Sequence, residues 1–426
     1  MMKPYSAMTR DEQACEKELL QAVFDGYKTK GFSFNMARGK PGKDQLDLSM
    51  QMLDVLTSSG NCAAADGVDC RNYGELSGII DAKKLFAEYM GVSTDEIFIS
   101  GSASLTFMYD CLARAMLRGV LGSEKPWGQE GKIKFLCPVP GYDRHFAICE
   151  FLGIEMINIP TKAESPDMDL IEKLVASDAS IKGMWCVPKF SNPLGITYPD
   201  QTIRRLAALK TAAKDFRIFC DNAYAMHEIY KDVPLLNLLD ECKRCGNPNM
   251  VYMFGSTNKI TFPGAGVAFF AASKENINFT TKQLSMQAIS WDKLNMLRHV
   301  RFLKSVEGIR TQMKKHASLL RPKFDAVLTK LTTELKGRGA GDWVKPDGGY
   351  FITFIAEAGC AKRIVALCKE AGLIMTDAGA THPYGKDTED RYIRIAPSFP
   401  SLAELEPAIE IFCTAAKLAT VERALV

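Results

Sequence analysis

Residues 183–224 read GMWCVPKFSNPLGITYPDQTIRRLAALKTAAKDFRIFCDNAY, and this stretch decides the fold. It begins with a short apolar run, Gly183–Pro188, and passes through a loop containing Pro and Gly into the helical pattern Pro199–Lys214. It ends with a second apolar run, Arg217–Asp221. Two short apolar runs joined through a helix are typical of parallel strands with a helical crossover. The stretch therefore predicts an α/β fold with helices on both faces of a sheet.

The same alternation extends in both directions from this unit. Further apolar runs that fit strands are Ile97–Ser100, Ile133–Pro138, Glu155–Pro160, Met250–Phe254 and Gly266–Ala271. Helical patterns lie between several of them, at Leu105–Arg118, Phe146–Leu152 and Asp169–Ala176. We expect a mostly parallel seven-stranded sheet, and in such sheets the functional loops lie at the carboxyl ends of the strands.

The pattern changes after residue 290. A long helical stretch covers about residues 291–335, and a mixture of short strands and helices follows: Gly349–Ile355, Ala361–Ala371, Leu373–Thr376, Tyr392–Ala396 and a C-terminal helix. This order predicts a smaller α+β domain. We therefore expect three parts: an N-terminal segment 1–60 that packs with the small domain, a large domain 61–300, and the small C-terminal domain 301–426.

Composition excludes several classes of protein. Of the 426 residues, 47% are hydrophobic and 24% are charged, which excludes a disordered chain. The net charge of +3 predicts no nucleic acid and no anionic membrane surface as a partner. No apolar run approaches the roughly 20 residues that span a bilayer, and the N-terminus lacks the apolar core of a signal peptide. The 13 cysteines are scattered, and five of them (Cys137, Cys186, Cys220, Cys368 and Cys413) lie in apolar runs, which is typical of buried reduced thiols and favours a cytoplasmic location.

The one close cysteine pair is Cys242 and Cys245, in ECKRCGN. A structural zinc site usually needs a second pair of ligands at a suitable spacing, and the sequence offers none. We expect no metal.

The loops after the expected strands carry GSAS, PGYDRH, SNPLG, DNAY and STNK. Taken singly, Asn192 reads as a turn residue, Asp221 as a helix cap and Lys259 as a solvated lysine. Taken together and in this order, they fit pyridoxal phosphate. A lysine forms a Schiff base with its aldehyde, an aspartate pairs with the pyridine nitrogen, and a Gly/Ser-rich loop that opens a helix binds the phosphate.

With these motifs the chain resembles fold-type-I pyridoxal-phosphate aminotransferases of the aspartate aminotransferase superfamily. It is most similar to a divergent bacterial subgroup of aspartate aminotransferases with ARGKP, GYDRH and STSKIT-like segments. The resemblance extends from ARGKP at residues 37–41, through NYGELSG at 72–78, to Arg394. It implies a homodimer with shared active sites, whose small-molecule partners are amino acids and 2-oxo acids.

The resemblance also implies roles for individual residues. The catalytic residues would be Lys259, as the Schiff-base lysine and proton shuttle, with Asp221 on the pyridine nitrogen and Tyr224 on the ring 3-oxygen. The other cofactor-binding residues would be Ser102, Ala103, Ser104, Tyr142, Asn192, Ser256, and Tyr73 from the neighbouring subunit. Substrate would bind at Arg394, which clamps the α-carboxylate, and at Gly39, Arg144 and Asn192. Arg144 would read a distal carboxylate, although a surface-loop arginine is an equally good interpretation.

Two positions depart from the pattern of the family. Many aminotransferases carry an arginine eight residues beyond the lysine, where it contacts the phosphate, but this chain has Val267. Asn258 stands where a serine is usual in the subgroup. The phosphate must then meet other groups, and Lys40 and Arg38 are both candidates for the missing cation.

Transamination between aspartate and 2-oxoglutarate is the leading hypothesis for function. The alternatives on the same scaffold are a kynurenine or aromatic aminotransferase and a pyridoxal-phosphate β-lyase, which the fold does not separate. A transcriptional regulator would need an N-terminal DNA-binding domain, but only about 60 residues precede the main domain and they show no basic recognition helix. A homologue without cofactor would not be expected to keep Lys259, Asp221 and Tyr224.

Overall fold

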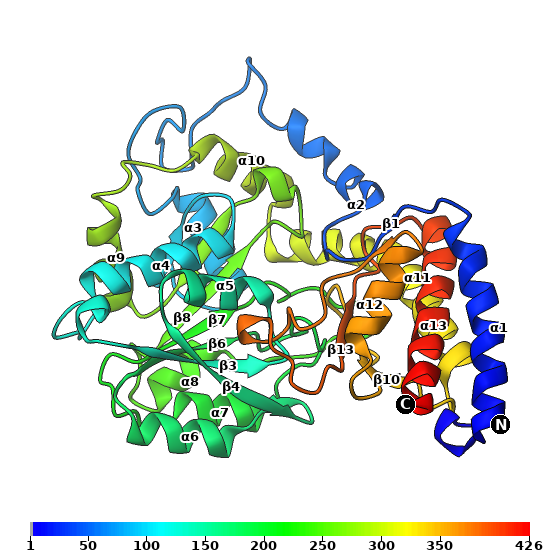
Figure 1. The fold of residues 1–426 in the computed structure, drawn as a ribbon. Helices are drawn as coiled ribbons and strands as arrows, with labels where there is room; N and C mark the ends of the chain where they lie inside the picture. The colour runs from blue at the N-terminus through cyan, green and yellow to red at the C-terminus, as the bar shows by residue number, and fades with distance from the viewer. Residues whose placement is uncertain (1–2) are drawn as a thin grey trace.

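A computed structural model describes residues 3–426 (Figure 1). Its largest sheet has eight strands in the order β2-β9-β8-β7-β6-β3-β4-β5. The strands are β2 (Ile97–Ile99), β3 (Lys134–Val139), β4 (Glu155–Lys162), β5 (Ser165–Pro166), β6 (Ile181–Cys186), β7 (Arg217–Asp221), β8 (Val251–Ser256) and β9 (Ala268–Ala271). β3, β4, β6, β7 and β8 run parallel, and β9 is antiparallel to both of its neighbours. The mainly parallel α/β fold is confirmed, and the two-residue β5 adds an eighth strand at one edge.

Helices cover both faces of this sheet. One face packs against α3 (Ile80–Met90), α6 (Met168–Ser177), α7 (Asp200–Ala207), α8 (Leu238–Arg244) and α10 (Lys293–Leu303), and the other against α4 (Ser104–Arg118), α5 (Asp143–Phe151) and α9 (Lys274–Leu284). Successive strand residues alternate between the faces: Ile218 and Cys220 join the first core and Phe219 the second. Because both of their faces are buried, the central strands β6 and β7 are buried along their whole length, whereas β4, near the edge of the sheet, has exposed residues.

The helix expected at Pro199–Lys214 is shorter than the sequence pattern indicates. α7 ends at Ala207, whose carbonyl accepts a hydrogen bond from Asn247 Nδ2 at 2.9 Å. The backbone N–H of Ala212 donates to the carbonyl of Val175 at 2.7 Å. These partners, distant in sequence, satisfy backbone groups that a longer helix would have satisfied itself, so residues 208–214 leave the helix.

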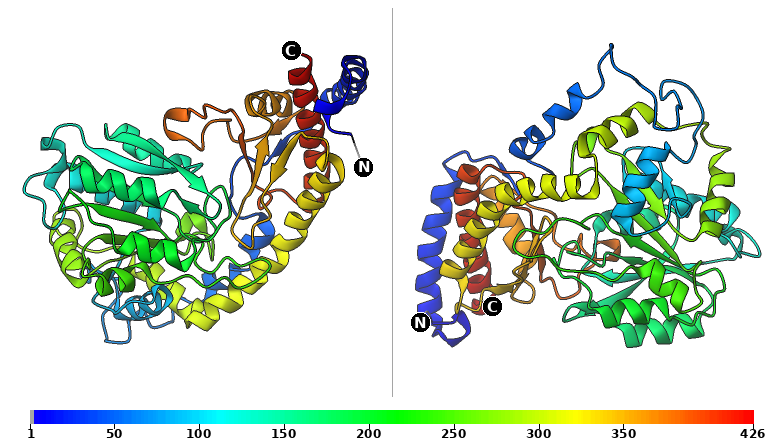
Figure 2. Two further views of the ribbon diagram at one scale, coloured as in Figure 1. Left: turned by 90° about the horizontal axis from the view of Figure 1, so that it is seen from below. Right: turned by 180° about the vertical axis from the view of Figure 1, so that it is seen from behind.

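A second, smaller sheet is antiparallel and contains β10 (Gly341–Trp343), β11 (Ile352–Ala356) and β13 (Tyr392–Ile395), while β1 (Phe34–Asn35) pairs in parallel with β12 (Leu373–Ile374). Around these strands lie α1 (Arg10–Lys28), α12 (Ala361–Glu370) and α13 (Leu402–Leu425). Figure 2 shows both chain ends at this end of the molecule, where Arg10 Nη2 donates to the carbonyl of Leu425 at 3.1 Å. The N-terminal helix therefore packs with the C-terminal one.

The helical stretch expected over about 291–335 is two helices. α10 ends at Leu303, the next residue Lys304 has a φ of +65°, and α11 (Val306–Leu335) starts after Ser305. The Ser305 hydroxyl accepts from the backbone N–H of Gly308 at 3.1 Å and caps the new helix. α11 then runs from the larger sheet to the smaller one (Figure 2). The remaining short elements are α2 (Lys43–Asp47) and single turns at Tyr5–Ala7, Met50–Asp54, Trp127–Gln129, Pro263–Ala265 and Pro383–Gly385.

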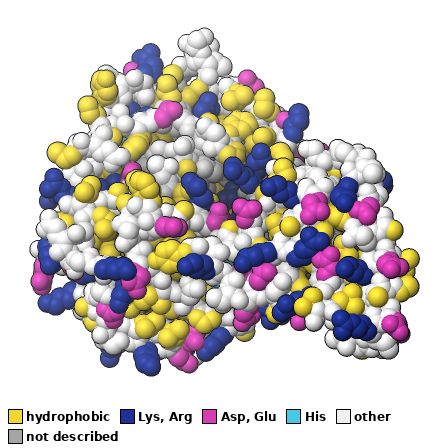
Figure 3. All heavy atoms as spheres, in the orientation of Figure 1, with side chains coloured by type: hydrophobic (Ala, Val, Ile, Leu, Met, Phe, Trp, Pro, Cys, Tyr) yellow, Lys and Arg dark blue, Asp and Glu magenta, His cyan; other side chains and the backbone are white. Residues whose placement is uncertain are grey.

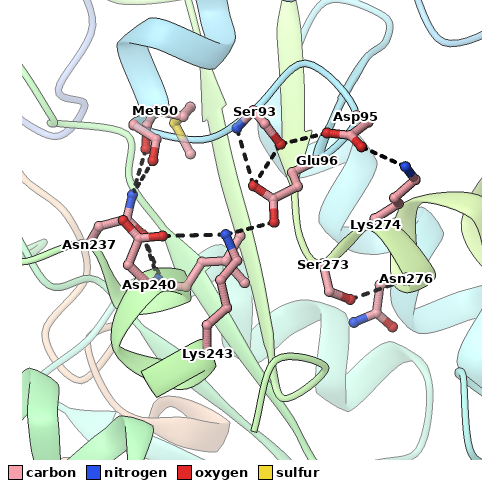
Figure 4. A network of polar contacts seen from close by, with 12 residues as sticks. Met90, Ser93, Asp95, Glu96, Asn237, Asp240, Lys243, Ser273, Lys274 and Asn276 are labelled. Carbon is pink, nitrogen blue, oxygen red and sulfur yellow. Dashed lines mark hydrogen bonds and ion pairs between the residues drawn. The ribbon is translucent and has the colours of Figure 1, made fainter. Parts of the chain in front are cut away.

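A polar network holds the amino end of β2 (Figure 4). Glu96, just before the strand, accepts from Ser93 Oγ at 2.9 Å and pairs with Lys243 of α8 at 2.7 Å. Lys274 of α9 pairs with Asp95 at 2.9 Å. Burial alone would raise the pKa of Glu96, but the hydrogen bonds from Lys243 and Ser93 outweigh it and lower the pKa. The network ties β2 to two helices, and the other end of β2 leads into the GSAS loop.

Candidate active site

The motif residues meet where parallel strands end. Asp221 is the last residue of β7, and Lys259 lies in the turn that follows the neighbouring β8. Asn192 and Tyr142 follow β6 and β3, the next strands in the sheet. Carboxyl ends of parallel strands share one edge of a sheet, so these loops converge. Figure 3 shows this side of the molecule hollowed between its two parts, with Lys and Arg side chains around the recess.

Asp221 is buried, and its two carboxylate oxygens differ. Oδ2 accepts from His145 Nε2 at 3.1 Å, whereas Oδ1 is buried without a hydrogen-bond partner among residues 3–426. The imidazole of His145 stacks on Trp185, with ring centroids 4.1 Å apart and planes 6° apart. A buried carboxylate oxygen without a donor is costly. Asp221 is therefore arranged to accept one further N–H.

Lys259 is half-buried, and its ammonium lies 4.8 Å from the ring centroid of the buried Tyr224. Burial lowers the pKa of Lys259, and the nearby carboxylate of Asp221 only partly opposes this. A lysine with a lowered pKa carries more neutral amine at neutral pH, which is the form that attacks an aldehyde or accepts a proton.

Two buried histidines hold the turn that carries Lys259. His299 Nδ1 donates to the carbonyl of Asn295 at 2.8 Å, so its unprotonated Nε2 accepts from the hydroxyls of Thr257 and Thr261 at 3.0 and 2.9 Å. His316 is the opposite tautomer: Nε2 donates to the carbonyl of Ile260 at 3.0 Å. Its Nδ1 accepts from Gln45 Nε2 at 3.1 Å.

Burial keeps both imidazoles neutral. It lowers the pKa of His299 to about 4 and also lowers the pKa of His316. Sequence reasoning missed both residues, since neither belongs to a motif. The apolar helical spacing around them indicated only a buried helix face.

Arg394, the residue expected to bind the substrate α-carboxylate, lies on β13. Its Nη1 donates to Asp143 Oδ1 at 2.9 Å and to Asn192 Oδ1 at 3.1 Å, and its Nη2 donates to Thr376 Oγ1 at 3.1 Å. Its Nε is buried without a partner among the described residues. The strand alternation expected from the sequence holds, since Ile393 and Ile395 pack into the small core. Asp143 was missed, although it lies within the GYDRH motif.

Gly39 allows a close approach beside Arg394. A Cβ at residue 39 would overlap the ring of Phe351. The same ring lies 4.8 Å from the guanidinium carbon of Arg394. The glycine of ARGKP therefore lets Phe351 support the guanidinium.

The expected phosphate end is the start of α4. Ala103 is the N-cap residue and Ser104 the first helical residue, and no side chain caps the helix. The first-turn N–H groups, together with the hydroxyls of Ser102 and Ser256, could therefore bind an anion. The side chain of Val267 is buried, and its backbone N–H donates to Thr257 Oγ1 at 2.9 Å.

Three further residues expected at the site are Tyr142, Arg144 and Tyr73. The ring centroid of Tyr142 lies 4.9 Å from that of His145, with the two ring planes at 77°. Arg144 is exposed on α5. Tyr73 is 77% exposed and lines a cavity of about 350 Å³ together with Met286 and Ile289. Exposure in a single chain is what we expect of a residue that contacts the active site of a neighbouring subunit.

Pyridoxal phosphate fits this donor set. Asp221 offers a free oxygen to a protonated ring nitrogen, Lys259 offers an amine of lowered pKa, and the uncapped start of α4 offers N–H groups to a phosphate.

Within residues 3–426 no group of three or more metal-ligating side chains occurs. Cys242 is buried and Cys245 exposed, at the end of α8. No helix in the same range is long and apolar enough to cross a membrane.

Comparison with known proteins identifies relatives that are aminotransferases. The profile of the aspartate amino-transferase family matches residues 8–426. An aspartate aminotransferase of Corynebacterium glutamicum is 42% identical over 406 residues, covering 95% of this chain and 94% of the relative. The crystal structure of an aspartate transaminase from the same species superposes with a TM-score of 0.96 at 40% identity, covering 99% of each chain. The α-aminoadipate aminotransferase of Thermus thermophilus, at 19% identity and a TM-score of 0.73 over 92% of this chain and 93% of that one, shares the fold.

Proposed function

Because the chain belongs to the aspartate aminotransferase family, we propose that it transfers the amino group of aspartate to 2-oxoglutarate with pyridoxal phosphate as cofactor. That it is an aminotransferase follows from the family and its relatives. The activity named for the Corynebacterium relative supports the choice of aspartate. In this chain, one observation carries the choice of cofactor: the free, buried Oδ1 of Asp221 beside the turn of Lys259.

The residues of the chain would divide the chemistry between them. When bound, pyridoxal phosphate withdraws electrons from the carbon that bears the transferred amino group. Asp221 would hold the proton on the pyridine nitrogen through Oδ1, while His145 orients the carboxylate through Oδ2. Lys259 Nζ would accept the α-proton of the substrate and return it on the product side.

Further residues would bind the cofactor and orient the substrate. Tyr224 and Asn192 would bond the ring 3-oxygen, and Tyr142 would cover the ring. The fork of Arg394, already joined to Asn192 at 3.1 Å, would bind the α-carboxylate. Arg144 would bind the distal carboxylate that distinguishes aspartate and glutamate from alanine.

We also propose a homodimeric assembly, a division into three parts and a cytoplasmic location. The exposed Tyr73 supports a homodimer in which this residue completes the neighbouring site. The large sheet and the two small sheets pack against separate hydrophobic cores, which supports the division into 1–60, 61–300 and 301–426. Ten of the 13 cysteines are buried and all are free, which supports a reducing cytoplasm.

A half-reaction screen tests the function. Each amino acid is added singly to the purified, cofactor-loaded protein, and conversion to the pyridoxamine form is followed by absorbance. Aspartate and glutamate should convert it fastest. Preference for kynurenine or aromatic amino acids, or release of pyruvate and ammonia from a β-substituted amino acid, would support the alternatives instead. Borohydride reduction followed by peptide mapping should place the cofactor on Lys259, and an adduct on another lysine would refute the assignment.

The role of Arg144 needs its own comparison. Arg144→Ala should weaken the reactions of aspartate and glutamate far more than that of alanine, because a lost bidentate charge contact is worth roughly 2–5 kcal/mol. Equal losses for aspartate and alanine would show that Arg144 does not read the side chain.

A further inference from the structure

The two loops expected around the phosphate meet at Gly266. A Cβ at this residue would overlap Asn258 Oδ1 and would lie 2.7 Å from the carbonyl oxygen of Ser102. The carbonyl of Ser102 belongs to the GSAS loop, and Asn258 precedes Lys259. The start of α4 and the lysine turn therefore lie against each other at this glycine, so an anion bound by the α4 N–H groups lies close to residues 258 and 266.

The helix α10 packs on the same place. Asn295 Nδ2 donates to the carbonyls of Ala265 and Gly266, at 3.1 and 2.9 Å. Just before the helix, the ring of Trp291 would lie 3.6 Å from a Cβ on Gly101. One end of α10 therefore covers both loops that the phosphate would contact.

Arg298 lies one turn along this helix and lacks a counter-charge. Its Nη2 donates to Asn295 Oδ1 at 2.6 Å, which places the guanidinium beside the amide that holds Gly266. Its Nε is buried without a hydrogen-bond partner, and no carboxylate lies within ion-pair distance of Arg298 anywhere in residues 3–426. A partly buried guanidinium without an anion is costly, and its planar fork matches a phosphate.

The other cations near these loops have different partners. Lys293 Nζ, on the same helix, is bound by the backbone carbonyls of Asn72 and Gly74. Lys40 lies 3.9 Å from the ring centroid of Phe399, on the side of the smaller sheet. Arg38 is exposed, and the side chain at position 267 is an apolar, buried valine.

We propose that Arg298 binds the phosphate of the cofactor and supplies the positive charge that position 267 lacks in this chain. The proposal rests on the proposed function, because it requires pyridoxal phosphate at this site. It replaces Lys40 and Arg38, the two cations that the sequence suggested, by one on α10.

Comparing two ligands that differ only in the phosphate tests this role. Dissociation constants of pyridoxal phosphate and of pyridoxal are measured on the cofactor-free protein by equilibrium dialysis, for the parent and for Arg298→Met. The variant should bind pyridoxal phosphate about 10- to 100-fold more weakly and pyridoxal within about twofold of the parent, since only the charged contact is lost. Arg310→Met, at an exposed arginine of α11, is the matched control and should change neither constant.

The two ligands distinguish a failure of the Arg298 contact from a failure of the proposed function. Equal weakening of both ligands, or no weakening of pyridoxal phosphate, would overturn the role of Arg298. Failure of the parent protein to bind pyridoxal phosphate would instead overturn the proposed function. If Arg298→Met does not fold, Arg298→Lys keeps the charge without the fork and should still weaken pyridoxal phosphate by about 3- to 10-fold relative to pyridoxal. Unchanged affinity in that variant would count against the bidentate contact.

Discussion

Arg394 Nη1 lies 2.9 Å from Asp143 Oδ1, so the guanidinium expected to bind the substrate carboxylate already contacts a carboxylate of its own chain. Asp143 is the first residue of α5, and Arg394 lies 251 positions further along the chain. The pair is largely enclosed, with the side chain of Arg394 6% exposed and that of Asp143 32% exposed. A substrate must share this guanidinium with Asp143 or displace it.

Replacing Asp143 should therefore strengthen substrate binding. Asp143→Asn keeps a hydrogen-bond acceptor for Arg394 but removes the competing charge, which is worth about 1–2 kcal/mol. The KM for aspartate should fall about 5- to 30-fold, with a smaller change in kcat. Steady-state kinetics with aspartate and with alanine measure this. Both amino acids should gain, because both carry the α-carboxylate, and a raised KM would show that Asp143 helps to bind the substrate.

Asp221→Ala should separate cofactor attachment from turnover. Without the carboxylate the pyridine nitrogen loses its charged partner, and the ring withdraws electrons poorly. Transamination should fall at least 100-fold, while borohydride still attaches the cofactor to Lys259. Near-parent rates in this variant would mean that another group protonates the ring.

Uptake of pyridoxal phosphate should depend on which nitrogen of His299 accepts a hydrogen bond, and not on a charge of the imidazole. In His299→Gln, the amide oxygen can reach the place of Nε2 and accept from Thr257 and Thr261. In His299→Asn, the shorter chain can replace only Nδ1. We expect the Asn variant to take up pyridoxal phosphate about tenfold more slowly than the Gln variant, because the lysine turn loses its acceptor.

Nitrogen-15 NMR of the imidazoles should also show a neutral Nδ1–H form for His299 and a neutral Nε2–H form for His316, with or without cofactor. A charged His299 at neutral pH, or equal uptake by the two variants, would contradict this picture.

Asp215 should contribute to the loss of stability in acid. It is buried and accepts from Lys182 at 2.8 Å, Ser123 at 2.7 Å and Trp127 at 2.8 Å. Burial alone would raise its pKa, but these hydrogen bonds outweigh it and lower the pKa. Its contribution is therefore present above the unfolded value of about 3.9 and is lost as the pH falls through the lower folded value.

Asp215→Asn should lower the free energy of unfolding by about 1–3 kcal/mol at pH 7, because Lys182 loses one of its two carboxylate partners and keeps only Glu130. Its unfolding curve should also respond less to pH below about 4 than that of the parent. Urea unfolding between pH 3 and 7 measures both effects. Asp200→Asn, in an exposed pair with Arg204 at 3.5 Å, is the control and should change stability by less than about 0.5 kcal/mol. Equal effects of the two substitutions would refute the role of Asp215.

Mixing two inactive variants should test whether sites are shared. Tyr73→Ala and Lys259→Ala subunits, mixed equally and allowed to exchange, should form hybrids with one intact site, recovering about a quarter of the parent activity. Light scattering on the same samples gives the assembly state. An active monomer, or a mixture that stays inactive although hybrids form, would refute a contribution of Tyr73 across the interface.

The amino-acid sequence alone was sufficient for the class of fold and for the order of the motifs. The central strands β6, β7 and β8 are buried on both faces, so each is a nearly continuous apolar run, and the loop that follows each of them lies at the carboxyl edge of the sheet. Asp221 and Lys259 could be placed at that edge because their positions depend only on the strands that precede them. Their chemical roles came from the resemblance and stay predictions.

The tertiary structure decided what depends on partners distant in the sequence. α7 ends early because Asn247 and Val175 form hydrogen bonds with backbone groups at and just after its end. α10 and α11 are separate helices because Lys304, between them, has a positive φ that no sequence pattern indicated. Asp143 meets Arg394, and Asn295 places Arg298 beside Gly266, through contacts that no local pattern encodes. Local propensity determines where an element begins, but its packing against the rest of the chain determines where it ends and which side chains meet.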